Sequence, residues 1–74
     1  MDKKKETPHE KFIRIASSRT QKIIDMVRLL GNCSNKYVYE YSEEEVDKIF
    51  LTIEKELQSA HDKFKEQRKT KFKL

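Results

Sequence analysis

Two helix-start signatures constrain the fold of this chain more than any other feature. Each is a hydroxyl residue followed three positions later by a glutamate: Thr7 with Glu10, and Ser42 with Glu45. In such a capping box each side chain accepts a hydrogen bond from the other residue's exposed backbone N–H at the start of a helix. Pro8 follows Thr7, at the first helical position, where the missing N–H costs nothing. The sequence therefore predicts two helices separated by a connection.

The limits of the two helices are predicted from residues with known preferences at helix ends. The single glycine, Gly31, is expected to take the left-handed conformation that commonly stops a helix. Tyr41 and Val46 flank the second cap at the spacing of a hydrophobic staple, which fixes the entry of the chain into a helix. We therefore expect helices over residues 8–30 and 43–68.

Both predicted helices carry an apolar stripe along one side, with the spacing of three to four residues that is typical of amphipathic helices. In the first helix the stripe is formed by Phe12, Ala16, Thr20, Ile23, Val27 and Leu30, and is widened by Ile13, Ile24 and Met26. In the second helix a coiled-coil-like spacing runs through Val46, Ile49 or Phe50, Ile53, Leu57, Ala60, Phe64 and Gln67. Leu51 lies off the second stripe and is a candidate for a further contact surface.

Two helices cannot enclose a core of their own, so their apolar sides must meet another surface. The predicted fold class is all-α: an antiparallel helical hairpin completed by a partner protein or by dimerisation, most simply as a four-helix bundle. We assign residues 1–7 to a basic flexible N-terminus, 8–68 to the hairpin domain and 69–74 to a basic C-terminal tail. A chain of 74 residues is near the size at which one core gives only marginal stability.

Charge is distributed unevenly along the chain, although the net charge is only +4. Residues 1–39 carry nine basic and four acidic side chains, residues 40–60 carry two and seven, and residues 61–74 carry six and two. A hairpin would place the basic first helix beside the acidic start of the second. Helix pairing does not explain the basic C-terminal end.

The connection holds all three tyrosines of the protein. Tyr37, Tyr39 and Tyr41 alternate, which in an extended chain places them on one side. Three interpretations are open: a plug for the open end of the hairpin, a protein-recognition surface, or rings that stack on bases. Asn32 and Asn35 are read as ordinary turn residues. The predicted partner-binding residues are Arg28, Lys36, Tyr37, Tyr39 and Tyr41.

Nothing in the sequence predicts an active site, so we expect a protein that is not an enzyme and has no cofactor or metal. His9 and His61 are expected to face solvent, and neither belongs to a ligand spacing typical of metal sites. Cys33 is the single cysteine, which excludes an internal disulfide. No apolar run approaches a membrane span of about 20 residues, and no signal peptide is visible. We predict a cytoplasmic protein that does not bind membranes.

The segments around the connection, Arg28–Asn32, Ser34–Asn35 and Tyr39–Phe50, read RLLGN, SN and YEYSEEEVDKIF. This pattern resembles small uncharacterised helical-hairpin proteins of bacterial mobile elements, such as plasmids and phages of Gram-positive bacteria. The resemblance covers about residues 12–64 and is most specific in the connection. It implies an accessory protein of a mobile element but carries no activity to transfer.

The hypothesis that combines these observations is an accessory protein that docks on a larger enzyme of the same element and helps to hold DNA. The enzyme would be a polymerase, primase, helicase or recombinase, and the chain alone would form a homodimer. Binding through phosphates would be independent of base sequence. The alternatives are a module that binds only protein, or an inhibitor whose acidic patch at residues 40–47 mimics nucleic acid. The predicted nucleic-acid-binding residues are Lys3, Lys4, Lys5, Lys11, Arg14, Arg19, Lys22, Lys65, Arg68, Lys69, Lys71 and Lys73.

Overall fold

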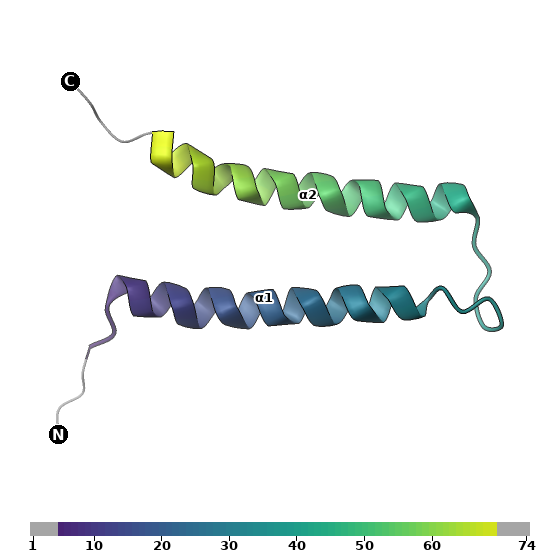
Figure 1. The fold of residues 1–74 in the computed structure, drawn as a ribbon, viewed down its shortest axis with the longest axis horizontal. Coiled ribbons are helices and arrows are strands. Elements are labelled where there is room, and N and C mark those ends of the chain that lie inside the picture. The colour runs from purple at the N-terminus through teal and green to yellow at the C-terminus, as the bar shows by residue number, and fades with distance from the viewer. Residues whose placement is uncertain (1–4, 70–74) are drawn as a thin grey trace. The chain divides into compact units, whose positions relative to one another are not determined.

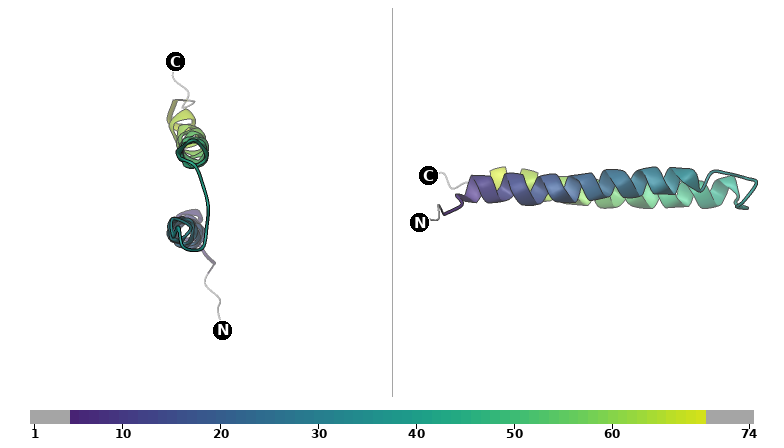
Figure 2. Two further views of the ribbon diagram at one scale, coloured as in Figure 1. Left: turned by 90° about the vertical axis from the view of Figure 1, so that its right-hand side faces the viewer. Right: turned by 90° about the horizontal axis from the view of Figure 1, so that it is seen from below.

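The computed structural model describes the backbone of residues 5–69 and the side chains of residues 5–67. Two helices make up its regular secondary structure (Figure 1): α1 spans Pro8–Asn32 and α2 spans Glu43–Lys69. Each is continuous from end to end (Figure 2), and no strand occurs within residues 5–69. At 1.5 Å per residue the helices are about 37 and 40 Å long. The predicted all-α class is confirmed for the described residues.

Both predicted capping boxes are present and start the helices where the sequence placed them. The N–H of Glu10 donates to Thr7 Oγ1 at 3.0 Å, and the N–H of Thr7 donates to Glu10 Oε1 at 3.0 Å. At α2 the N–H of Glu45 donates to Ser42 Oγ at 3.1 Å, and the N–H of Ser42 donates to Glu45 Oε1 at 2.8 Å. Each box satisfies two backbone donors that a helix start leaves exposed.

The residues around the second cap also behave as the sequence predicts. Tyr41 and Val46 are both half-buried, whereas most described residues are exposed, in agreement with the staple. The first turn of α2 contains Glu43, Glu44 and Glu45, where carboxylates interact favourably with the positive end of the helix dipole. The entry of the chain into α2 is therefore determined by local chemistry alone.

The predicted end of α1 at Gly31 is wrong. The helix continues to Asn32, and the glycine does not have a positive φ. The N–H of Cys33 donates to the Leu30 carbonyl at 3.0 Å, and the N–H of Ser34 donates to the Gly31 carbonyl at 3.1 Å. These i to i+3 bonds tighten the last turn and satisfy its carbonyls, so a left-handed residue is not needed.

The chain divides into two compact units, Met1–Tyr39 with α1 and Glu40–Leu74 with α2. Among the described residues none is buried. Ile15, Leu30 and Val46 are half-buried, and the other large apolar side chains of the helices range from 38% exposed at Ile24 to 62% at Met26 and Leu57. In proteins a helix gains most of its stability from packing an apolar side against another surface. Each helix therefore presents an apolar surface that can still be covered.

Candidate interaction surfaces

The apolar side of α1 is wide enough to form two neighbouring seams. One, here called the Arg19 seam, contains Phe12, Ile15, Arg19, Ile23, Met26 and Leu30. The other, here called the Thr20 seam, contains Ile13, Ala16, Thr20, Ile24 and Val27. Both recur every three or four residues, so each forms a stripe along the helix. A helix that meets one partner needs one such stripe, and α1 offers two.

A charged residue stands in the middle of the Arg19 seam. In a helix, side chains three or four residues apart are neighbours on the surface, so Arg19 lies between Ile15 and Ile23. Ile15 is half-buried and Ile23 is 56% exposed. The sequence analysis listed Arg19 among the basic nucleic-acid-binding residues, but the helix places it on the apolar side. Whatever covers this seam must offer a carboxylate or leave the guanidinium access to water.

Three other basic residues of α1 share a side. Lys11 and Lys22 are separated by 11 residues, close to three full turns, and Arg14 lies one turn from Lys11. Arg28 lies apart from them, towards the far edge of the Thr20 seam. Lys5, Lys11, Lys22 and Arg28 are exposed, as is Lys65 on α2.

Several predicted nucleic-acid-binding residues cannot be placed. Lys3, Lys4, Lys71 and Lys73 lie outside the described residues, and Arg68 and Lys69 belong to the last turn of α2, with side chains outside the described part.

Arg14 forms an ion pair that the sequence did not predict. Its guanidinium donates to both carboxylate oxygens of Glu6, at 2.8 Å from Nε and 2.9 Å from the terminal nitrogen. This hydrogen bonding lowers the pKa of Glu6 and raises the pKa of Arg14, with a smaller contribution from charge attraction in both cases. The pair ties the segment before α1 to its second turn. It also neutralises part of the positive charge that Arg14 would offer to a phosphate.

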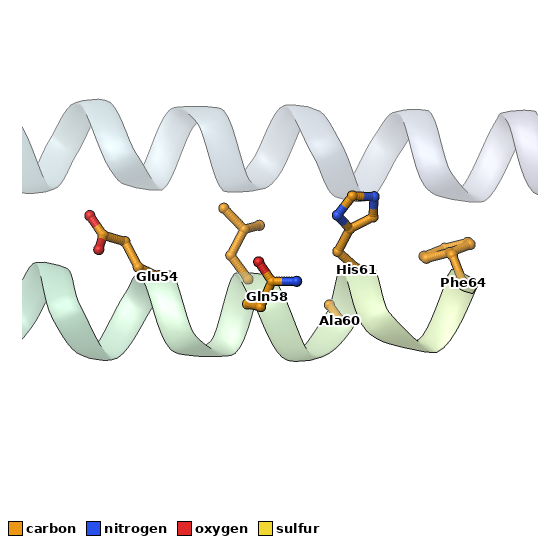
Figure 3. A pocket seen from close by; sticks show the side chains of 6 residues that line it. Glu54, Gln58, Ala60, His61 and Phe64 are labelled. Atoms are coloured by element: carbon orange, nitrogen blue, oxygen red, sulfur yellow. The ribbon is translucent and has the colours of Figure 1, made fainter. Parts of the chain in front are cut away.

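The side of α2 that carries the predicted stripe contains two shallow, open hollows. The first is lined by Tyr41, Glu45, Lys48, Ile49, Thr52 and Ile53. The second is lined by Glu54, Leu57, Gln58, Ala60, His61 and Phe64 (Figure 3). In the close-up, Glu54, His61 and Phe64 project from the same side of α2. Sequence reasoning assigned no role to His61 beyond solvent exposure; the structure places it at the edge of the stripe.

Polar side chains elsewhere on the helices make local contacts. Gln21 donates to Asp25 Oδ1 at 3.0 Å, and Gln58 donates to Asp62 Oδ1 at 2.8 Å. Asp25 is therefore paired with an amide. Such i, i+4 pairs stabilise helix surfaces and bring no reactive groups together.

The connection is not extended over residues 35–39, so the alternation of the tyrosines does not determine where they lie. The backbone N–H groups of Val38 and Tyr39 donate to the Asn35 carbonyl at 3.1 and 2.9 Å, and the N–H of Tyr37 donates to Asn35 Oδ1 at 2.9 Å. These bonds fold the segment into a turn because Asn35 captures three successive amides. The prediction that Asn35 acts as a turn residue is confirmed.

The turn gives the three tyrosines different environments. Tyr37 is 99% exposed, Tyr39 is 49% exposed and Tyr41 is half-buried. Tyr37 therefore makes almost no packing contact within the chain, while Tyr41 packs at the start of α2. Lys36 next to Tyr37 is exposed, as is Arg28 in α1. The tyrosines do not form the single aligned face that an extended connection would produce.

Groups with catalytic or metal-binding potential are dispersed. His9 and His61 are exposed, and Cys33 is a free exposed thiol whose Sγ lies 4.0 Å from the Leu29 carbonyl oxygen. Within the described part of the chain, no three His, Cys, Asp or Glu side chains are close enough to hold a metal ion. Over the same residues, neither helix combines the length and apolarity needed to cross a bilayer.

Comparison with known proteins adds no further constraint. The chain matches no protein-family model, no curated protein and no solved structure. The arguments for function therefore start from the surfaces described above.

Proposed function

We propose that the chain is a non-enzymatic, cytoplasmic accessory protein of a bacterial mobile genetic element. It docks on a larger replication or recombination enzyme and helps to hold nucleic acid through its basic ends. One observation carries this proposal: both helices are capped and regular, yet none of their described apolar side chains is buried. Exposed apolar surface of this kind is typical of proteins that contact other macromolecules.

The first contact is between the two helices of the chain. In this proposal α1 and α2 pair as an antiparallel hairpin, with the Arg19 seam against the stripe of α2. Glu54 and Glu56 flank that stripe, and either carboxylate would satisfy the guanidinium of Arg19. Charge supports the pairing, since the segment with α1 is basic and the start of α2 is acidic. Opposite charges at the flanks of a helix pair commonly set partner and orientation.

The second contact is with the larger enzyme. The turn between the helices supports this role because it exposes Tyr37 almost completely, beside Lys36. A large, stiff ring that buries nothing in its own chain is the kind of residue that anchors protein interfaces. Leu51, 54% exposed and off the stripe of α2, offers a further apolar contact. The chain alone forms a homodimer in this proposal.

The third contact is with DNA, through phosphates and without preference for base sequence. Lys5, Lys11 and Lys22 are exposed, and six basic side chains lie in residues 61–74 against two acidic ones. Binding of this kind weakens as salt rises, because each phosphate contact releases condensed counterions.

The test is a binding titration with fluorescent single- and double-stranded DNA of random sequence, from about 50 to 200 mM salt. Deletion of residues 66–74 is expected to leave the helix content of residues 8–65 intact, weaken binding at least about tenfold and flatten the salt dependence. A matched control replaces Lys48 and Lys55, in the acidic segment, by glutamine, and is expected to bind as the full chain does. Equal binding by the truncated and full-length chains would assign the basic end to solubility and leave a module that binds only protein.

A further inference from the structure

The Thr20 seam has a spacing that reads the same in both directions. From Ile13 to Val27 the steps are three, four, four and three residues, with Thr20 at the centre. All five side chains lie within one narrow stripe of α1, because each step is close to a full helical turn. Ile13 is 49% exposed, Ile24 is 38% and Val27 is 47%, and Ala16 is half-buried.

Such a palindrome suits a two-fold symmetric antiparallel contact between identical helices, because apolar residues of the two copies then fall at the same level. In an isologous interface, if residue i contacts residue j of the second copy, residue j contacts residue i in return. An antiparallel pair centred on Thr20 places Ile13 level with Val27 of the second copy, and Ala16 level with Ile24. Every large apolar residue of the seam then meets an apolar residue.

We infer that the Thr20 seam is the self-association surface of this protein. Two copies pair through α1 in antiparallel orientation, with the two Thr20 side chains at the two-fold axis. The inference rests on the proposed function in one respect, namely that the chain alone forms a homodimer. It adds the surface, the orientation and the register.

The neighbouring seam cannot serve as this surface. It has the same spacing from Phe12 to Met26, but its central residue is Arg19. A two-fold axis at that point would bring two guanidinium groups together in an apolar contact, which is costly without a partner for either charge. The Arg19 seam therefore suits a partner helix that carries carboxylates, and self-pairing is assigned to the Thr20 seam.

The charges that flank the Thr20 seam support the antiparallel register. Glu10 and Arg28 lie on the same flank of α1, near its two ends. In a two-fold antiparallel pair the same flanks of the two copies face each other. Glu10 is then level with Leu30 of the second copy, and Arg28 of that copy is two residues away, about 3 Å along the axis. Glu10 keeps one oxygen on the Thr7 amide and has lone pairs left for the guanidinium.

Small residues at the centre of the seam allow the helices to approach closely. Helix axes in contact lie about 8–10 Å apart, the closer value where the side chains are small. Ala16 and Thr20 are both small. With backbones on a radius of about 2.3 Å, the two Cα atoms of Thr20 come within the 4.4–6.8 Å that a disulfide spans.

The test is therefore a disulfide at the axis, in chains where Cys33→Ser removes the native thiol. The variant Thr20→Cys is expected to form a disulfide-linked dimer in oxidised glutathione, with most of the protein cross-linked and its helix content retained. The matched control is Ser18→Cys, which is exposed on the opposite side of α1, only two residues away. It is expected to cross-link at least about tenfold less, as measured by non-reducing electrophoresis.

Sedimentation of the Cys33→Ser chain, run in parallel, tests homodimer formation separately from the assigned surface. A dimer in which Thr20→Cys cross-links no better than Ser18→Cys overturns the assigned surface while homodimer formation stands. A folded monomer overturns both. Efficient cross-linking of Thr20→Cys, but not of Ser18→Cys, supports a two-fold axis at Thr20. A chain that carries both Ile13→Cys and Val27→Cys should then form a dimer with two disulfides.

Discussion

Two leucines of α2 provide a direct test of which apolar side is covered in the folded protein. Leu57 lies on the stripe and is 62% exposed in the chain; Leu51 lies off it and is 54% exposed. Complete burial of a leucine side chain contributes about 1.5–3 kcal/mol. Covering the exposed part of Leu57 would therefore contribute about 1–2 kcal/mol, and Leu57→Ala should lower the free energy of unfolding by that amount. The gain in helix propensity from alanine is the same at both positions and cancels in the comparison.

Leu51→Ala is the matched control, because residue type, helix and initial exposure are nearly the same. It should change the free energy of unfolding by no more than about 0.5 kcal/mol, as surface substitutions usually do. The assay is urea unfolding followed by far-ultraviolet circular dichroism, with all chains at one concentration because association contributes to stability. Equal losses from the two variants, or a loss from Leu51→Ala alone, would refute the assignment of the stripe.

Three further predictions follow from local features of the structure. Gly31→Ala should stabilise the chain by about 0.5–1 kcal/mol, since Gly31 is helical and an added Cβ would meet no atom within 4 Å; destabilisation in the same unfolding assay would mean a left-handed glycine. Replacement of Tyr37 by alanine should leave helix content and unfolding unchanged, because the ring is 99% exposed, while abolishing capture of the larger enzyme; a loss of stability would instead favour the plug interpretation. The Arg14 hydrogen bond lowers the pKa of Glu6 in the folded chain. The ion pair therefore stabilises the folded chain at pH values above about 4.3, the ordinary glutamate pKa. This stabilisation is lost as the pH falls through the lowered pKa of Glu6. In an NMR titration Arg14→Gln should therefore raise the pKa of Glu6, and an unchanged value would contradict the pairing.

Local chemistry explains why the starts of the helices were predictable. Thr7 and Ser42 act on amides three residues away, so their effect depends on a few neighbours that the sequence displays directly. The same holds for the apolar spacing, which requires only that the helix be continuous. The end of α1 was not predictable in this way. Gly31 permits a left-handed stop but does not require one, and backbone bonds from Cys33 and Ser34 close the helix without it.

The candidate surfaces were predicted less completely than the helices. Alternating tyrosines favour an extended strand, but Asn35 accepts three hydrogen bonds from the backbone amides that follow it, and these bonds favour a turn. The sequence analysis described the stripe of α1 as one surface through Thr20 and named Arg19 only among the nucleic-acid-binding residues. Division into two seams depends on the exact helical position of every residue. The Glu6–Arg14 pair spans eight positions across the helix start, a separation that no helical spacing rule covers.

Sedimentation combined with circular dichroism across a dilution series tests the central claim most directly: that the apolar sides of two well-formed helices are covered by association. The account predicts a particle of twice the chain mass at micromolar concentration, and loss of helix on dilution together with loss of the dimer. A monodisperse monomer that remains fully helical at micromolar concentration would contradict it.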